Sequence, residues 1–154
     1  MDSTRFLPTH ILVPTDFSGY AHQAFICAVN IASTCHSKVL LLHVIDEQIA
    51  QSVIDYFPGE TEGNKAIQRK LEATIDRLWH EIDSISDNAP EVGMTCEARQ
   101  GIPYDEILKE QQKSKIDLIV MASLGRTGIV NSMIGGVAEK VLRGAKCPVM
   151  LIRN

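Results

Sequence analysis

The chain has 154 residues, of which 45% are hydrophobic and 22% are charged, and its formal net charge is −4. This length predicts one domain with a buried core over residues 1–154 and is short for two domains. The negative balance disfavours a general binder of nucleic acid or membrane surfaces, because both need a basic field that attracts phosphates. No apolar run reaches the ~18 residues of a membrane span, and the N-terminus lacks a signal-peptide pattern, so we expect a soluble protein.

The charge is unevenly distributed along the chain. Residues 1–92 hold 6 basic and 13 acidic side chains, whereas residues 93–154 hold 9 basic and 6 acidic ones. If the protein binds an anion, the C-terminal third is therefore the expected place.

The first half of the chain predicts two buried strands joined by a helix. Residues 10–16 and Lys38–Asp46 are short, nearly unbroken runs of Val, Ile and Leu, as is typical of strands covered on both faces. Between them, Ser18 is placed to cap a helix, and apolar residues follow at helical spacing. These residues are Ala21, Ala24, Phe25, Ala28, Val29 and Ala32.

Residues 46–64 form the one long irregular segment, which is interpreted as a lid, an interaction loop or a disordered bridge, with none of the three favoured. A second helical stripe follows it. That stripe consists of Ile67, Leu71, Ile75, Trp79 and Ile82.

The second half of the chain continues the alternation of strands and helices. Residues 94–100 alternate apolar and polar side chains, which predicts an edge strand with one solvated face. Strands are also expected at 117–123 and 148–152, the latter as a terminal edge strand, and helices at 104–112 and 136–143. The whole pattern predicts an α/β fold, with a five-stranded parallel open sheet, right-handed crossovers and helices on both faces.

The four cysteines have no C-x-x-C spacing and lie within or beside apolar runs. They are therefore interpreted as buried thiols rather than as disulfides or zinc ligands, which indicates a reducing compartment, the cytoplasm. The residues are Cys27, Cys35, Cys96 and Cys147.

Candidate site residues follow from the rule that open parallel sheets bind ligands beyond the carboxyl ends of their strands. The first strand ends with Pro14, Thr15 and Asp16, and the second with Val44 and Asp46. The fourth ends with Met121, Ala122 and Ser123, directly before a glycine-rich segment.

Glycines in that segment have two interpretations. Gly125 and Gly128 shape a loop, and Gly135 with Gly136 opens a helix, so that backbone N–H groups could approach phosphate oxygens. Alternatively, the glycines only make turns and a close contact between helix and strand. Spacing alone favours the second interpretation, because neither G-x-x-x-x-G-K-[ST] nor G-x-G-x-x-G is present.

Asp16 also has two interpretations, as a helix cap or as a ligand for a ribose hydroxyl, and the residues do not choose between them. His43 lies inside an apolar strand and is interpreted as a hydrogen-bonded core residue outside any site. The other histidines have no metal-ligand spacing, and no catalytic triad or general base can be assembled from local motifs.

Four separated segments resemble the universal stress protein family in order and in sequence, over nearly the whole chain. They are "ILVPTDFS", "VLLLHVID", "GIPYDEIL" and the segment from "DLIVMASLG" to "CPVMLIR". In the nucleotide-binding branch of that family, the fourth strand leads into Gly, two residues, Gly, nine residues and then Gly-Ser or Gly-Thr. Ala122, Gly125, Gly135 and Gly136 occupy the corresponding positions here, so Ala122 and Gly136 depart from the pattern.

The resemblance implies a site for ATP or AMP, with or without Mg²⁺, and no metal site of the chain's own. By it, Pro14, Thr15 and Asp16 border adenine and ribose, Val44 lines the adenine pocket, Met121 lies near the ribose, and Val137 extends the phosphate loop. Ala122 adds a methyl group at the site. Gly136 lacks the hydroxyl that would contact the terminal phosphate, although the backbone N–H and the helix N-terminus remain.

Three functions are compared on this basis. The first is a stress-response module that binds adenine nucleotide, and the second is an interaction protein of the same fold without nucleotide. The third, a slow ATPase, is the least favoured because no general base is identified. A homodimer through the strand Val149–Ile152 is expected, since a bare apolar edge invites pairing with another chain and the resemblance implies the same.

Overall fold

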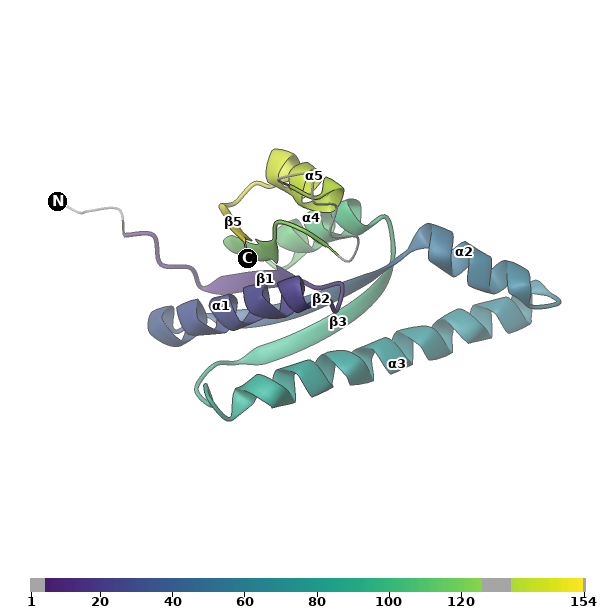
Figure 1. Ribbon diagram of the computed structural model, residues 1–154, viewed down its shortest axis with the longest axis horizontal. Coiled ribbons are helices and arrows are strands. Elements are labelled where there is room, and N and C mark those ends of the chain that lie inside the picture. The colour runs from purple at the N-terminus through teal and green to yellow at the C-terminus, as the bar shows by residue number, and fades with distance from the viewer. Residues whose placement is uncertain (1–4, 126–133, 154) are drawn as a thin grey trace.

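The computed structural model describes residues 5–125 and 134–153. Within these residues, five strands form one parallel sheet (Figure 1). The strands are β1 (His10–Pro14), β2 (Lys38–Asp46), β3 (Met94–Gly101), β4 (Leu118–Ala122) and β5 (Val149–Ile152). Their order is β3-β2-β1-β4-β5, which confirms the predicted fold class and the edge positions of β3 and β5.

The helices lie on both faces of the sheet (Figure 1). They are α1 (Gly19–Cys35), α2 (Glu47–Tyr56), α3 (Glu60–Ser86), α4 (Pro103–Lys113) and α5 (Gly136–Gly144). Successive strand residues face opposite sides. Ile11 and Val13 pack with α1 and α3, whereas Leu12 packs with α4 and α5. The two larger apolar clusters therefore lie on opposite sides of the sheet.

Local signals set the start of α1. The Ala21 N–H donates to Ser18 Oγ at 3.1 Å, which confirms Ser18 as the N-cap. The stripe expected after it is buried throughout, from Ala21 to Ala32. This cap fixes where the chain leaves β1, and hence the conformation of the β1–α1 turn.

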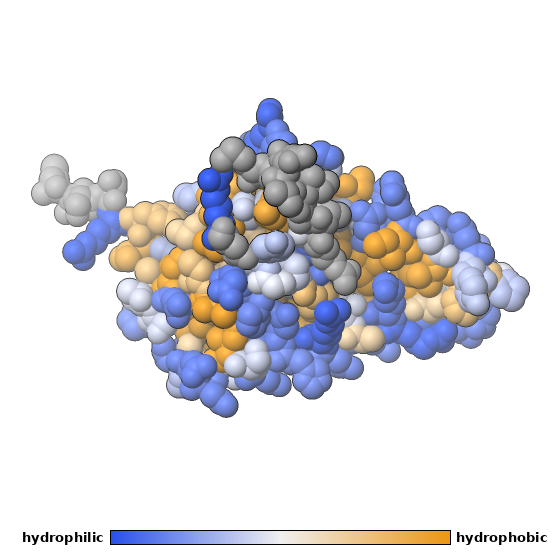
Figure 2. Space-filling model, in the orientation of Figure 1, coloured by the Kyte–Doolittle hydropathy of each residue, from blue (hydrophilic) through white to orange (hydrophobic). Residues whose placement is uncertain are grey.

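The interpretation of residues 46–64 as an irregular segment was wrong, because α2 and the start of α3 occupy it. These two helices form a hairpin that extends beyond the sheet, and Figure 2 shows hydrophobic side chains over α2. A Cβ atom on Gly63 would lie 2.9 Å from the Ile54 Cα, so glycine permits the close crossing of the helices. Only Ala50 is buried within α2, so this short helix depends on packing against α3, which periodicity does not show.

The expected stripe of α3 was wrong at one position. Leu78 is fully buried, whereas Trp79 is 43% exposed. Eleven residues after the buried Ile67, the helix has made about three complete turns, which places Leu78 on the same face and rotates Trp79 away from it. Successive steps of four had overshot the helical period.

The four cysteines carry free thiols, but they are half-buried rather than buried as expected. Burial raises the pKa of the Cys96 and Cys147 thiols, which disfavours their thiolate forms. No helix in the described part of the chain is long and apolar enough to cross a membrane.

Candidate nucleotide site

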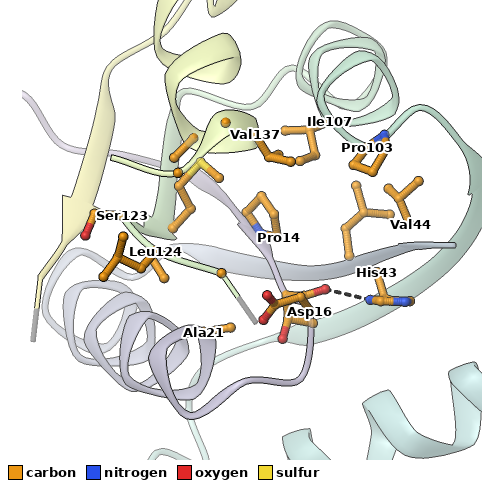
Figure 3. Close-up of a pocket in the computed structure, with 18 residues that line it drawn as sticks. Pro14, Asp16, Ala21, His43, Val44, Pro103, Ile107, Ser123, Leu124 and Val137 are labelled. Atoms are coloured by element: carbon orange, nitrogen blue, oxygen red, sulfur yellow. Dashed lines mark hydrogen bonds between the residues drawn. The ribbon is translucent and has the colours of Figure 1, made fainter. Parts of the chain in front are cut away.

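A pocket of about 300 Å³ opens at the carboxyl edge of the sheet, beside β1 and β4 (Figure 3). The chain leaves these two strands toward opposite faces, since α1 packs with one cluster and α5 with the other. This is where open α/β sheets bind ligands. Among the candidates at the strand ends, Asp46 does not line the pocket. The structure brings the other candidate residues together there: Pro14, Thr15, Asp16, Val44, Met121, Ala122, Ser123, Gly125, Gly135, Gly136 and Val137.

One end of the pocket is apolar. Val44 from β2 lies near Pro103 and Ile107 from α4, away from the Ser123 and Leu124 backbone (Figure 3). Pro103 is the first residue of α4, where its missing N–H costs no helical hydrogen bond. Such a surface suits a flat, weakly polar group such as a heteroaromatic base.

The β1–α1 turn forms the polar wall of the pocket. The Thr15 N–H donates to the Leu42 carbonyl at 2.8 Å, and Thr15 Oγ1 accepts the Phe17 N–H at 3.0 Å. His43 Nδ1 lies 2.7 Å from the Thr15 carbonyl, so Nδ1 carries the proton of that hydrogen bond. Thr15, at the start of the turn, is therefore tied to β2 through both its N–H and its carbonyl.

Asp16 has a different role at each of its carboxylate oxygens. Oδ1 accepts the Ser18 N–H at 3.0 Å, while Ser18 itself caps α1. Oδ2 faces the loop after β4, because a Cβ atom on Gly125 would lie 3.0 Å from it. Ser18 and not Asp16 is thus the N-cap of α1, and Asp16 lines the pocket.

The glycine-rich segment closes on itself at the pocket. The Gly135 N–H donates to the Ser123 carbonyl at 2.6 Å, and a Cβ atom on Gly135 would lie 3.3 Å from the same oxygen. Glycine at 135 therefore allows this close approach of two backbones. Ala122 lines the pocket and also packs against the cluster that contains α1. Gly128 lies outside the described residues.

The N-terminus of α5 supplies the positive end of the pocket. Gly135 is the N-cap and makes no side-chain cap hydrogen bond, and the Glu139 N–H is the first to bond back to its carbonyl, at 2.9 Å. The first N–H groups of a helix have no partner within that helix and carry partial positive charge. No lysine or arginine is among the described residues that line the pocket, and the positive groups among these residues are the backbone N–H groups at the start of α5.

Sequence reasoning missed several pocket residues. His43 was expected as a hydrogen-bonded residue outside any site; it makes a hydrogen bond, to the Thr15 carbonyl, but it also lines the pocket beside Val44. Pro103 and Ile107 belong to α4, which follows β3, and the rule about strand ends had not been applied to that strand. Ala21, Leu42, Leu124 and Ala138 complete the lining. In the described ranges, no three His, Cys, Asp or Glu side chains are placed to hold a metal ion.

This fold, with a pocket at the diverging ends of β1 and β4, defines an α/β protein of the type that binds ligands at the carboxyl edge of its sheet. The model of the universal stress protein family matches residues 8–153, and the chain belongs to that family.

Individual relatives agree with this assignment. The chain is 31% identical over 147 residues to universal stress protein MJ0531 of Methanocaldococcus jannaschii, covering 94% of this chain and 81% of the relative. The structure of protein MJ0577 from the same organism matches with a TM-score of 0.82 and 27% identity, covering 97% of this chain and 98% of that one. A more distant universal stress protein, solved in complex with cAMP, has the same fold with a TM-score of 0.62 at 19% identity, covering 96% and 98% of the two chains.

Proposed function

We propose that this universal stress protein binds an adenine nucleotide, ATP or AMP, in the pocket at the carboxyl edge of the sheet. The observation that carries the proposal is the arrangement of three chemically different walls around one cavity: an apolar end, a carboxylate and a helix N-terminus. A nucleotide has a base, a diol and phosphates, which need these three environments in turn. The complex of a distant family member with cAMP supports the choice of adenine.

Each wall has a defined part in the proposal. The base lies against Val44, Pro103 and Ile107, and Pro14 and Thr15 border it. The Asp16 carboxylate accepts hydrogen bonds from the ribose hydroxyls, beside Met121. The phosphates meet backbone N–H groups at Gly125, Gly135, Gly136 and Val137, where the α5 dipole favours negative charge. Mg²⁺, when present, enters with the phosphates.

The direct test has two parts. Purified protein is denatured, and any released small molecule is identified by mass spectrometry. Calorimetric titration of ATP, ADP and AMP into nucleotide-free protein then compares the parent with Asp16→Ala. A matched control is Asp46→Ala, since Asp46 Oδ1 also accepts a backbone N–H two residues on, from Gln48 at 2.8 Å, but Asp46 does not line the pocket.

We expect binding that Asp16→Ala weakens and Asp46→Ala leaves unchanged. Absence of binding by the parent at millimolar nucleotide would reject the proposal, and undiminished binding by a folded Asp16→Ala variant would reject the site assignment. Phosphate release over many turnovers would add ATP hydrolysis to the function.

We further infer that residues 1–154 act as one cytoplasmic domain and pair into a homodimer through β5. The pairing is supported by the position of β5 at the edge of the sheet, where Met150 is 39% exposed. An apolar edge strand offers unpaired backbone groups to a second copy. The free thiols support a reducing compartment.

A further inference from the structure

Phe17, the residue after Asp16, has an unusual backbone conformation. Its φ is 63°, in the left-handed region that bulky side chains rarely adopt. The other described non-glycine residues with positive φ, His36 and Lys115, lie just beyond the C-terminal ends of α1 and α4, where this conformation is common. Phe17 instead directly follows Asp16, which lines the pocket, in the turn between β1 and α1. Such strain persists only where the surroundings impose it.

Two side chains from different elements hold the Phe17 ring. The Arg77 guanidinium of α3 lies 3.9 Å from the ring centroid, and the His43 imidazole of β2 lies 4.7 Å away, tilted by 40°. The half-buried ring also packs against the apolar cluster between the sheet and α1 and α3. A cation over an aromatic face is attracted by the ring quadrupole. The ring is thereby held from both the sheet and α3.

The conformation of Phe17 determines where the Asp16 carboxylate points. Two hydrogen bonds brace the turn, the Phe17 N–H to Thr15 Oγ1 and the Ser18 N–H to Asp16 Oδ1, both 3.0 Å. The second depends on the φ of Phe17, because that angle sets the direction of the peptide group that carries the Ser18 N–H. The two hydrogen bonds close the turn so that Asp16 Oδ2 is directed at Gly125. With an ordinary φ at residue 17, the Ser18 N–H would point elsewhere and the carboxylate would lose this anchor.

We propose that Phe17, held by Arg77, is a positioning residue that fixes the Asp16 carboxylate toward the ribose of the bound nucleotide. The proposal rests on the proposed function, since it assigns the ribose to Asp16. By this proposal, α3 affects ligand affinity through the Arg77–Phe17 contact, although no residue of α3 lines the pocket.

The test compares ATP with 2′,3′-dideoxy-ATP, which lacks the hydroxyls that Asp16 is proposed to bind. The dissociation constant of 2′,3′-dideoxy-ATP divided by that of ATP reports the carboxylate's contact with the diol. A general loss of stability weakens the binding of both nucleotides and leaves this ratio unchanged. Arg77→Met removes the cation and is expected to reduce the ratio about two- to fivefold. Phe17→Gly tolerates the positive φ but removes the ring, and is expected to bring the ratio close to that of Asp16→Ala.

Two variants serve as controls. Phe17→Tyr retains the aromatic ring and is expected to keep the parent ratio. Arg69→Met removes another exposed arginine of α3, and it too is expected to leave the ratio unchanged. A parent-like ratio in folded Arg77→Met and Phe17→Gly would overturn the positioning role while leaving nucleotide binding intact.

Hydrogen exchange in the nucleotide-free protein separates the two proposals. The Ser18 amide is expected to exchange slowly in the parent and in Arg69→Met, and faster in Arg77→Met and Phe17→Gly. If the parent binds no nucleotide but this pattern holds, the proposed function fails and the control of Asp16 by Phe17 stands. If Ser18 exchanges equally in all variants, the positioning role is overturned whatever the nucleotide data show.

Discussion

The Asp16 carboxylate and the Gly125 backbone lie against each other across the pocket, because a Cβ atom on residue 125 would come within 3.0 Å of Asp16 Oδ2. Asp16 follows β1 and Gly125 follows β4, so the contact spans the two strands at which the chain diverges. Because residue 125 has no side chain, it does not crowd the Asp16 carboxylate.

We expect Gly125→Val to weaken ATP binding at least about tenfold, since the added side chain displaces Asp16 Oδ2 and crowds the ligand. Calorimetric titration measures the effect. Gly19→Val is the matched control, because a Cβ atom on Gly19 meets nothing within 4 Å at the start of α1. Parent-like affinity in folded Gly125→Val would contradict the proposed position of the nucleotide.

Gly136→Ser is expected to tighten ATP more than AMP. A Cβ atom on Gly136 meets nothing within 4 Å, so the serine fits without displacing its neighbours. Its hydroxyl adds one hydrogen bond at the helix N-terminus, worth about 0.5–1.5 kcal/mol if neutral and up to about 3 kcal/mol if charge-assisted. This corresponds to roughly two- to a hundredfold in affinity.

Gly136→Ala separates the hydroxyl from the added carbon and is expected to leave the ratio of the ATP and AMP affinities unchanged. If Gly136→Ser changes the affinities for ATP and AMP by the same factor, the absent hydroxyl does not explain the affinity for the terminal phosphate.

Arg99→Met is expected to destabilise the fold by about 3 kcal/mol. Glu110 on α4 is fully buried and pairs with Arg99 of β3, which also lies 2.8 Å from Glu97 and 3.8 Å from Glu106. Burial lowers the pKa of Arg99, but the hydrogen bond to Glu97 and the charges of Glu110, Glu97 and Glu106 together raise this pKa above its ordinary value. Without the guanidinium, the buried Glu110 loses its positive partner and, among the described residues, keeps only the hydrogen bond from the Ser114 hydroxyl.

Urea unfolding measures the loss in free energy of unfolding. Arg143→Met is the control, because it breaks an exposed ion pair with Glu139 and should cost less than about 1 kcal/mol. The double variant Arg99→Met with Glu110→Gln is expected to recover part of the loss, because no buried charge then remains. Equal stability of the Arg99 and Arg143 variants would show that the cluster contributes little.

Met150→Lys is expected to shift the protein from dimer toward monomer, because it places a charge on the outer strand proposed to pair with a second copy. Light scattering over a range of protein concentrations measures the assembly. Leu142→Lys changes a similarly exposed apolar residue that lies on α5 and not on the outer strand, and it should leave the dimer intact. A parent protein that stays monomeric at high micromolar concentration would contradict the dimer.

The sequence by itself determined the elements whose signals are local. Ser18 caps α1 through a hydrogen bond three residues away, and runs such as Lys38–Asp46 carry the apolar character of a buried strand within themselves. Alternation along β3 identified an edge strand. Parallel strands place their carboxyl ends at one edge, so Asp16 and the residues after β4 could be expected at a common site before any contact was known.

Only the tertiary structure decided the features that depend on contacts between distant segments. The α2 helix forms because it packs on α3, and Leu78 is buried because the sheet covers that face of the helix. His43 lines the pocket, although its strand looks like core, because the β1–α1 turn ends beside it. The left-handed Phe17 is held by Arg77, which lies 60 positions further along the chain. Such contacts have no periodic or local signal, because their partners meet only after the chain has folded.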